Sequence, residues 1–97
     1  MKIELKKFGN ILGSRPAGKD AYSGYLSELS EVAENEIVEV DFSDVLSFAP
    51  SWGDEFLTPL LEKFGDKLKL INTENTSVTL TLELLEETNN YQFNRDK

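Results

Sequence analysis

The chain has 97 residues, a net charge of −8, and neither cysteine nor histidine. This length suits a single domain (1–97), and 39% hydrophobic with 29% charged residues is typical of a soluble globular protein. The composition excludes disulfides, Ser-His-Asp catalysis and most zinc sites, so we expect no metal or cofactor. The acidic charge disfavours nucleic acid and anionic lipid, and no apolar run is long enough for a membrane span. We therefore expect a cytoplasmic protein whose partner is a protein, with no nucleic-acid or membrane partner.

The N-terminal residues predict strands. Polar and apolar residues alternate over 2–8, which is the pattern of a half-buried strand. Gly9-Asn10 suits a tight hairpin, because glycine takes positive φ at the first turn position. We expect 11–12 to form a short return strand and 13–18 to form a loop.

Three later segments predict one helix and two strands. A helix is expected from about 18 to 30, because apolar residues recur there at three- and four-residue spacing. They are Ala21, Tyr22, Tyr25, Leu26 and Leu29. The alternating segments 36–42 and 67–71 predict further strands, each with one apolar face.

A second helix is expected to begin at Ser51, which is a good N-cap residue, and to end at Gly65. Asp54 and Glu55 would lie in its first turn, where the helix dipole favours acids. Pro59 would cost a hydrogen bond or kink the helix. The expected buried residues are Trp52, Phe56, Leu57, Leu60, Leu61 and Phe64.

The run 78–85 fits either a strand or a helix, and the nearby Asn, Thr and Glu residues favour a helix. Strands that alternate with helices predict an α/β fold. We expect about four strands in a mixed sheet, with three helices mainly on one face. The other face would be partly open and able to carry an oligomer contact. Residues from about 90 to 97 are expected to be a frayed tail.

The segment Gly13–Lys19 matches the phosphate-binding loop pattern G-x-x-x-x-G-K, but Asp20 stands where Ser or Thr would bind magnesium. Pro16 also stiffens this loop. Nucleotide or phosphate binding here is therefore the alternative hypothesis, with Arg15 and Lys19 holding the anion beside a helix N-terminus.

Ser51 and Trp52 each allow two interpretations. Ser51 is a helix cap or, at a helix N-terminus, a phosphorylation site. Trp52 is a core residue or an exposed docking anchor, since tryptophan is frequent among interface hot spots. The acids Asp54 and Glu55 fit a helix start better than paired catalytic acids.

The run "VEVDFSDVLSFAPSWGDEFLTPLL" (38–61) is similar to the signature segment of the STAS domain of anti-sigma-factor antagonists. More closely, "FGNILGSRPAG" (8–18) and "APSWGDEFL" (49–57) resemble the STAS-like family of unassigned function, which comprises small bacterial and phage-borne proteins. The resemblance covers most of residues 3–88 and implies a STAS-like fold.

The resemblance also implies a non-enzymatic regulatory module that binds a GHKL-type ATPase or kinase, a histidine-kinase-like partner. Such a partner phosphorylates a serine in the STAS loop and so switches the association. Here Ala49 and Pro50 stand at the family's Asp and phosphorylated Ser, and Ser51 matches the second serine. Either Ser51 has taken the role of the phosphorylated serine, or the switch is absent and only the binding face remains. We favour the second alternative. Ser51, Trp52, Asp54 and Glu55 would then contact the partner.

Overall fold

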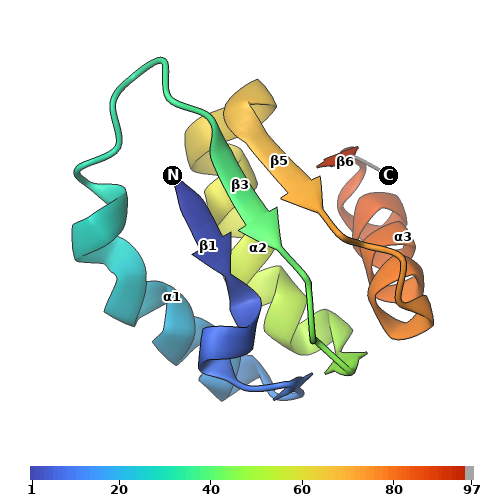
Figure 1. The fold of residues 1–97 in the computed structure, drawn as a ribbon. Coiled ribbons are helices and arrows are strands. Elements are labelled where there is room, and N and C mark those ends of the chain that lie inside the picture. Colours follow the sequence, from blue (N-terminus) through green and yellow to red (C-terminus); the bar gives the residue numbers. More distant parts are fainter. Residues whose placement is uncertain (96–97) are drawn as a thin grey trace.

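The computed structural model describes residues 1–95, which contain three α-helices and six strands (Figure 1). In chain order the elements are β1 (Lys2–Glu4), the 3₁₀ helix η1 (Leu5–Phe8), β2 (Ile11–Leu12), α1 (Arg15–Leu29), β3 (Val38–Asp41), β4 (Ser47–Phe48), α2 (Pro50–Phe64), the 3₁₀ helix η2 (Gly65–Lys67), β5 (Leu68–Ile71), α3 (Thr76–Asn89) and β6 (Asn94–Arg95).

The main sheet has four strands in the order β1-β3-β5-β6, and a separate small sheet consists of β2 and β4. The α/β class and the number of strands in the main sheet are confirmed. Every strand pairing within residues 1–95 is parallel, so the expected mixed sheet is wrong. Parallel pairing follows from the helices that cross from one strand to the next.

The predicted hairpin at Gly9-Asn10 is also wrong. Two consecutive lysines after Leu5 break the alternation, and the chain turns into η1 instead of extending β1. Gly9 does take a positive φ of 120°, but it directs the chain away from β1. The short strand 11–12 therefore pairs with Ser47–Phe48.

The main sheet has one apolar and one polar face. Across the sheet, Ile3 lies beside Val40 and Val40 beside Leu70, and all three side chains are fully buried. The alternate row places Lys2 beside Glu39, and these two side chains are exposed or half-buried. In Figure 1, α2 lies behind the sheet with α1 and α3 to either side, and the near face is uncovered. The prediction of three helices mainly on one face is therefore confirmed.

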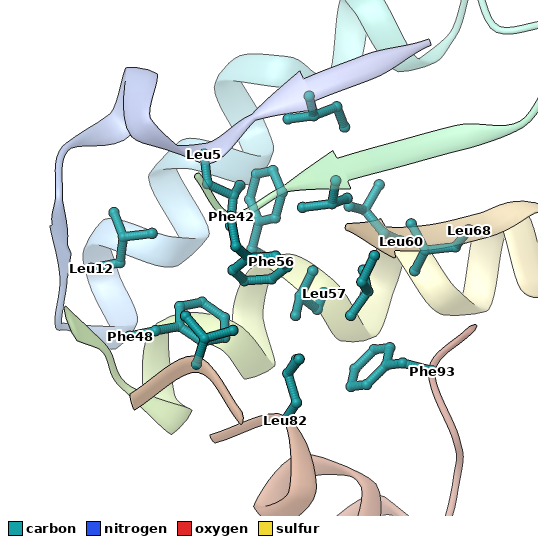
Figure 2. Packing of buried hydrophobic residues seen from close by; sticks show 14 of the residues in the cluster. Leu5, Leu12, Phe42, Phe48, Phe56, Leu57, Leu60, Leu68, Leu82 and Phe93 are labelled. Carbon is teal, nitrogen blue, oxygen red and sulfur yellow. The ribbon is translucent and has the colours of Figure 1, made fainter. Parts of the chain in front are cut away.

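The core lies between the apolar sheet face and the helices. Figure 2 shows Phe56 and Leu57 of α2 among side chains from the sheet, with Leu82 and Phe93 approaching from the α3 side. The segment 78–85 is helical, as favoured, and Asn75 caps α3 by accepting a hydrogen bond from the Val78 amide. Pro59 lies inside α2, as expected.

Two expectations at the edges of the core need correction. Leu26 is one of the recurring apolar residues that predicted α1, but it is 43% exposed. Part of the tail expected to fray is instead held in place: Phe93 is buried and β6 pairs with β5. An aromatic residue and a short strand are enough to fix this segment, and residues 96–97 of the expected tail lie outside the described residues.

Candidate functional site

The small sheet brings together the two segments that the sequence singled out. Ile11 pairs with Ser47 and Leu12 with Phe48, and the Ala49 amide donates to the Leu12 carbonyl oxygen at 2.9 Å. Each strand leads almost directly into a helix. The N-termini of α1 and α2 consequently begin side by side.

A glycine allows these two helices to pack closely. A Cβ atom at Gly18 would lie 2.6 Å from the backbone oxygen of Trp52 and 3.0 Å from its Cα. Both are backbone atoms, so the contact could be relieved only by separating the helices. Gly18 therefore has a packing role, whereas the phosphate-loop pattern would use it to bind an anion.

Trp52 belongs to the core, and its predicted role as a partner contact is wrong. The side chain is 2% exposed, and its ring stacks on Phe56 with centroids 5.0 Å apart. Phe8 and Phe48 contact other parts of the ring, with centroids 6.0 Å away. A side chain enclosed in this way offers a partner almost no surface.

Ser51 is the second residue of α2, so the prediction that it is the N-cap is wrong. Ala49 is the N-cap, and within residues 1–95 no side chain caps this helix. Pro50 occupies the first helical position, where its missing amide hydrogen costs nothing. The Ser51 hydroxyl is half-buried and donates a long hydrogen bond of 3.4 Å to the Gly13 carbonyl oxygen.

Arg15 links the two helix starts. Its guanidinium lies 3.1 Å from a carboxylate oxygen of Asp54 and 2.5 Å from one of Glu55. Hydrogen bonds to Asp54 and then to Glu55 raise the pKa of Arg15 further above its already high value. The two acids lie beyond the first turn of α2, so the expected placement at the helix dipole is wrong. Their partner on α1 was not foreseen.

The geometry does not form a phosphate-binding loop at Gly13–Lys19. Residues from Arg15 onward are already helical, and the Ser14 hydroxyl caps α1 by accepting from the Ala17 amide at 3.2 Å. Pro16 offers no amide hydrogen, and Arg15 is paired with carboxylates. Of the two residues predicted to hold an anion, only Lys19 extends into solvent without an ion pair in the described part of the chain.

A shallow hollow of about 290 Å³ lies beside Ser51. Residues from both helix starts and from the second half of α3 line it: Arg15, Pro50, Ser51, Asp54, Leu84, Leu85, Thr88 and Asn89. Three of the predicted site residues, Ser51, Asp54 and Arg15, thus share one surface. Glu55 joins them through its ion pair with Arg15.

Asp41 anchors the loop that leads into β4. It ends β3 with its side chain only 6% exposed. One carboxylate oxygen accepts from the Asn72 amide group and from the Ser43 backbone amide, both at 2.9 Å, and the other lies 3.4 Å from the Lys2 ammonium. Burial alone would raise the pKa of Asp41, but these hydrogen bonds lower it to about 2.

Two features are absent from residues 1–95. No cluster of three or more potential metal-binding side chains occurs there. In the same part of the chain, no helix is both long and apolar enough to cross a membrane.

Comparison with curated proteins and with solved structures finds no match to this chain. A family model does match residues 26–78, more than half of the chain. This range includes the α2 segment around Ser51, although not the first motif at 8–18. The model describes a STAS-like domain of unknown function (DUF4325), and the chain therefore belongs to this STAS-like family.

Proposed function

We propose that this protein is a non-enzymatic regulatory module that binds a protein partner through the outer face of the α2 start. That face consists of Ser51, Asp54 and Glu55, and we call it the α2 face. One observation carries the proposal: the two motifs that resemble the family meet at the α2 face, yet its three side chains remain partly exposed. If the motif served packing alone, we would expect these side chains to be buried, as that of Trp52 is.

The charge of the protein favours a partner with a basic face. The chain carries a net charge of −8, and two of the three side chains in the α2 face are carboxylates. Complementary charges accelerate association and exclude partners of the same sign. Because STAS domains bind GHKL-type ATPases or kinases, this class is the first to test, with the cytoplasm as the expected location.

The sequence alone favoured the absence of a switch, but the position of Ser51 beside Arg15 leads us to propose phosphorylation of Ser51 as the regulatory step. Ser51 lines the same hollow as Arg15, whose guanidinium is shared by Asp54 and Glu55. A phosphate on Ser51 would compete with both carboxylates for Arg15 and would add about two negative charges to the α2 face. Binding of a basic partner would change sharply as a result.

The test compares variants in which carboxylate side chains are replaced by uncharged amides of nearly the same shape. The variant Asp54→Asn/Glu55→Gln removes two charges from the α2 face. Glu31→Gln/Glu34→Gln removes two charges from the exposed connection between α1 and β3, at the opposite end of the molecule (Figure 1). Each protein is used as bait in lysate of the native host, and captured proteins are identified and then titrated in purified form.

We expect a purified partner to bind the wild type and the Glu31/Glu34 control equally, and to bind the α2-face variant more weakly. Equal affinity for all three proteins would contradict the proposal, as would the absence of any partner that binds the wild type in purified form.

A further inference from the structure

Two exposed leucines lie one helical turn apart on α3. Leu80 is 61% exposed and Leu84 is 47% exposed, although both belong to an otherwise well-packed helix. Residues four apart share one face of a helix, so these side chains form a continuous apolar strip. We call this pair the α3 ridge. Single exposed leucines are common, but a pair on one rigid helix face is a more specific feature.

The α3 ridge borders the α2 face. Leu84 lines the hollow that Pro50, Ser51 and Asp54 also line. The N-terminal half of α3 is fixed to β4, because the Ser77 hydroxyl accepts from the Phe48 amide at 2.9 Å and the Thr81 hydroxyl donates to the Phe48 carbonyl oxygen. The ridge therefore holds a fixed position relative to Ser51 and the helix starts.

Acidic side chains flank this apolar strip on α3. Glu83 and Glu87 are exposed, each three residues after a ridge leucine, whereas Asp54 across the hollow is paired with Arg15, which lines the hollow too. A surface with an apolar centre and an acidic rim is complementary to an amphipathic helix that carries apolar residues on one face and lysine or arginine beside them. It would repel an acidic helix of the same shape.

We propose that the α3 ridge and the hollow beside Ser51 form the docking site for a basic amphipathic helix of the protein partner. This inference rests on the proposed function and names the chemistry of the partner. The apolar side chains of the helix contact Leu80 and Leu84, and its basic side chains face Glu83 and Glu87. Ser51 lies at the edge of the bound helix, where an added phosphate alters the contact.

The test uses a helical peptide of about 18 residues, roughly five turns, with leucine on one face and lysine and alanine elsewhere. A matched peptide has glutamate in place of lysine. Binding to the full chain is followed by changes in backbone amide NMR signals. The variant Leu80→Ser/Leu84→Ser removes the ridge, and Leu26→Ser removes an exposed leucine of α1 as the control.

We expect the lysine peptide to shift the amide signals of the α3 ridge and of Ser51 in the wild type and in Leu26→Ser. The ridge variant should bind the peptide about tenfold more weakly or worse, as for an interface hot spot, and the glutamate peptide should not bind. Signal changes spread over the whole acidic surface, or equal affinity for the ridge variant, would overturn the inference, as would no binding of the lysine peptide.

The affinity of the natural partner for the two variants distinguishes failure of this inference from failure of the proposed function. If the partner loses affinity for the Asp54/Glu55 variant but not for the ridge variant, the inference fails while the proposed function stands. If neither variant affects the partner, both fail.

Discussion

The first turns of α2 have an inner face that is apolar and buried and an outer face that is polar and partly exposed. On the inner face, Trp52 and Phe56 are almost fully buried and stack on each other. On the outer face, Ser51, Asp54 and Glu55 are partly exposed. Ser51 contacts Gly13, just before α1, and the two acids contact Arg15 in the first turn of α1. Residues that are neighbours in the sequence thus have different roles. The motif "APSWGDEFL" contributes some side chains to the core and others to the exposed surface.

The largest effect is expected on the inner face. Trp52→Ala should lower the free energy of unfolding by about 3–5 kcal/mol, because it leaves a cavity in contact with Phe8, Phe48 and Phe56. Urea unfolding followed by circular dichroism measures this change. A loss below about 1 kcal/mol would mean that Trp52 is not enclosed and that the two faces do not differ as described.

The contact between the helices provides a paired test with two glycines of α1. Gly18→Ala should destabilise the protein by about 1–3 kcal/mol, because its Cβ would meet the Trp52 backbone. Gly24→Ala should stabilise it by up to about 1 kcal/mol, since no described atom lies within 4 Å of the added Cβ and alanine favours a helix. The same sign for both variants in thermal unfolding would contradict the close approach of α1 and α2.

Asp41 supports the loop between the sheet and the α2 face, and its effect depends on pH. Its pKa is about 2 in the folded protein against an ordinary value of 3.8, so its ionised form stabilises the fold by roughly 2 kcal/mol. This contribution is present above about pH 4 and is lost as the pH falls from 4 towards 2. Asp41→Asn should therefore be less stable than the wild type at pH 7, with the difference vanishing below pH 2. A difference that is constant over this range would show that the carboxylate is not held as described.

The smallest effect on stability is expected on the outer face. Arg15→Gln removes exposed ion pairs with Asp54 and Glu55, and such pairs contribute little to folding. Its melting temperature should be close to that of the wild type, and the small difference should shrink as salt is added. Affinity for the partner should nevertheless change, because Arg15 orients both acids. A large loss of stability would contradict this account, because it would show that the outer face also stabilises the fold.

The sequence allowed much of the fold to be predicted, because long alternating or helical patterns report burial directly. The strand 36–42 and the buried stripe of α2 followed from such patterns, and Leu68 and Leu70 marked β5. The two-residue strand 11–12 carries no period, so its partner depends on tertiary contacts. Nothing local indicated that it would pair with residues 36 positions away in parallel orientation.

The candidate site was predictable in composition but not in geometry. Resemblance to the family located Ser51, Asp54 and Glu55, whereas the exposure of Trp52 could not be read from its neighbours. The ion pair from Arg15 to Asp54 spans 39 residues, and a charged pair at that distance leaves no periodic signal. The exposure of Leu80 and Leu84 was not predicted for a different reason: with Val78 and Leu82 they fit the alternation of a strand, so the pattern did not separate exposed from buried leucines.

The most direct test of the central claim places a photo-reactive amino acid at position 51 in the native host. The same amino acid at position 23, an exposed serine of α1, is the control. The account predicts a specific protein adduct after irradiation at position 51 and none at position 23, with the cross-link mapping to a basic segment of the partner. Identical adducts at both positions, or none at position 51, would contradict the claim that the outer face of α2 binds a protein partner.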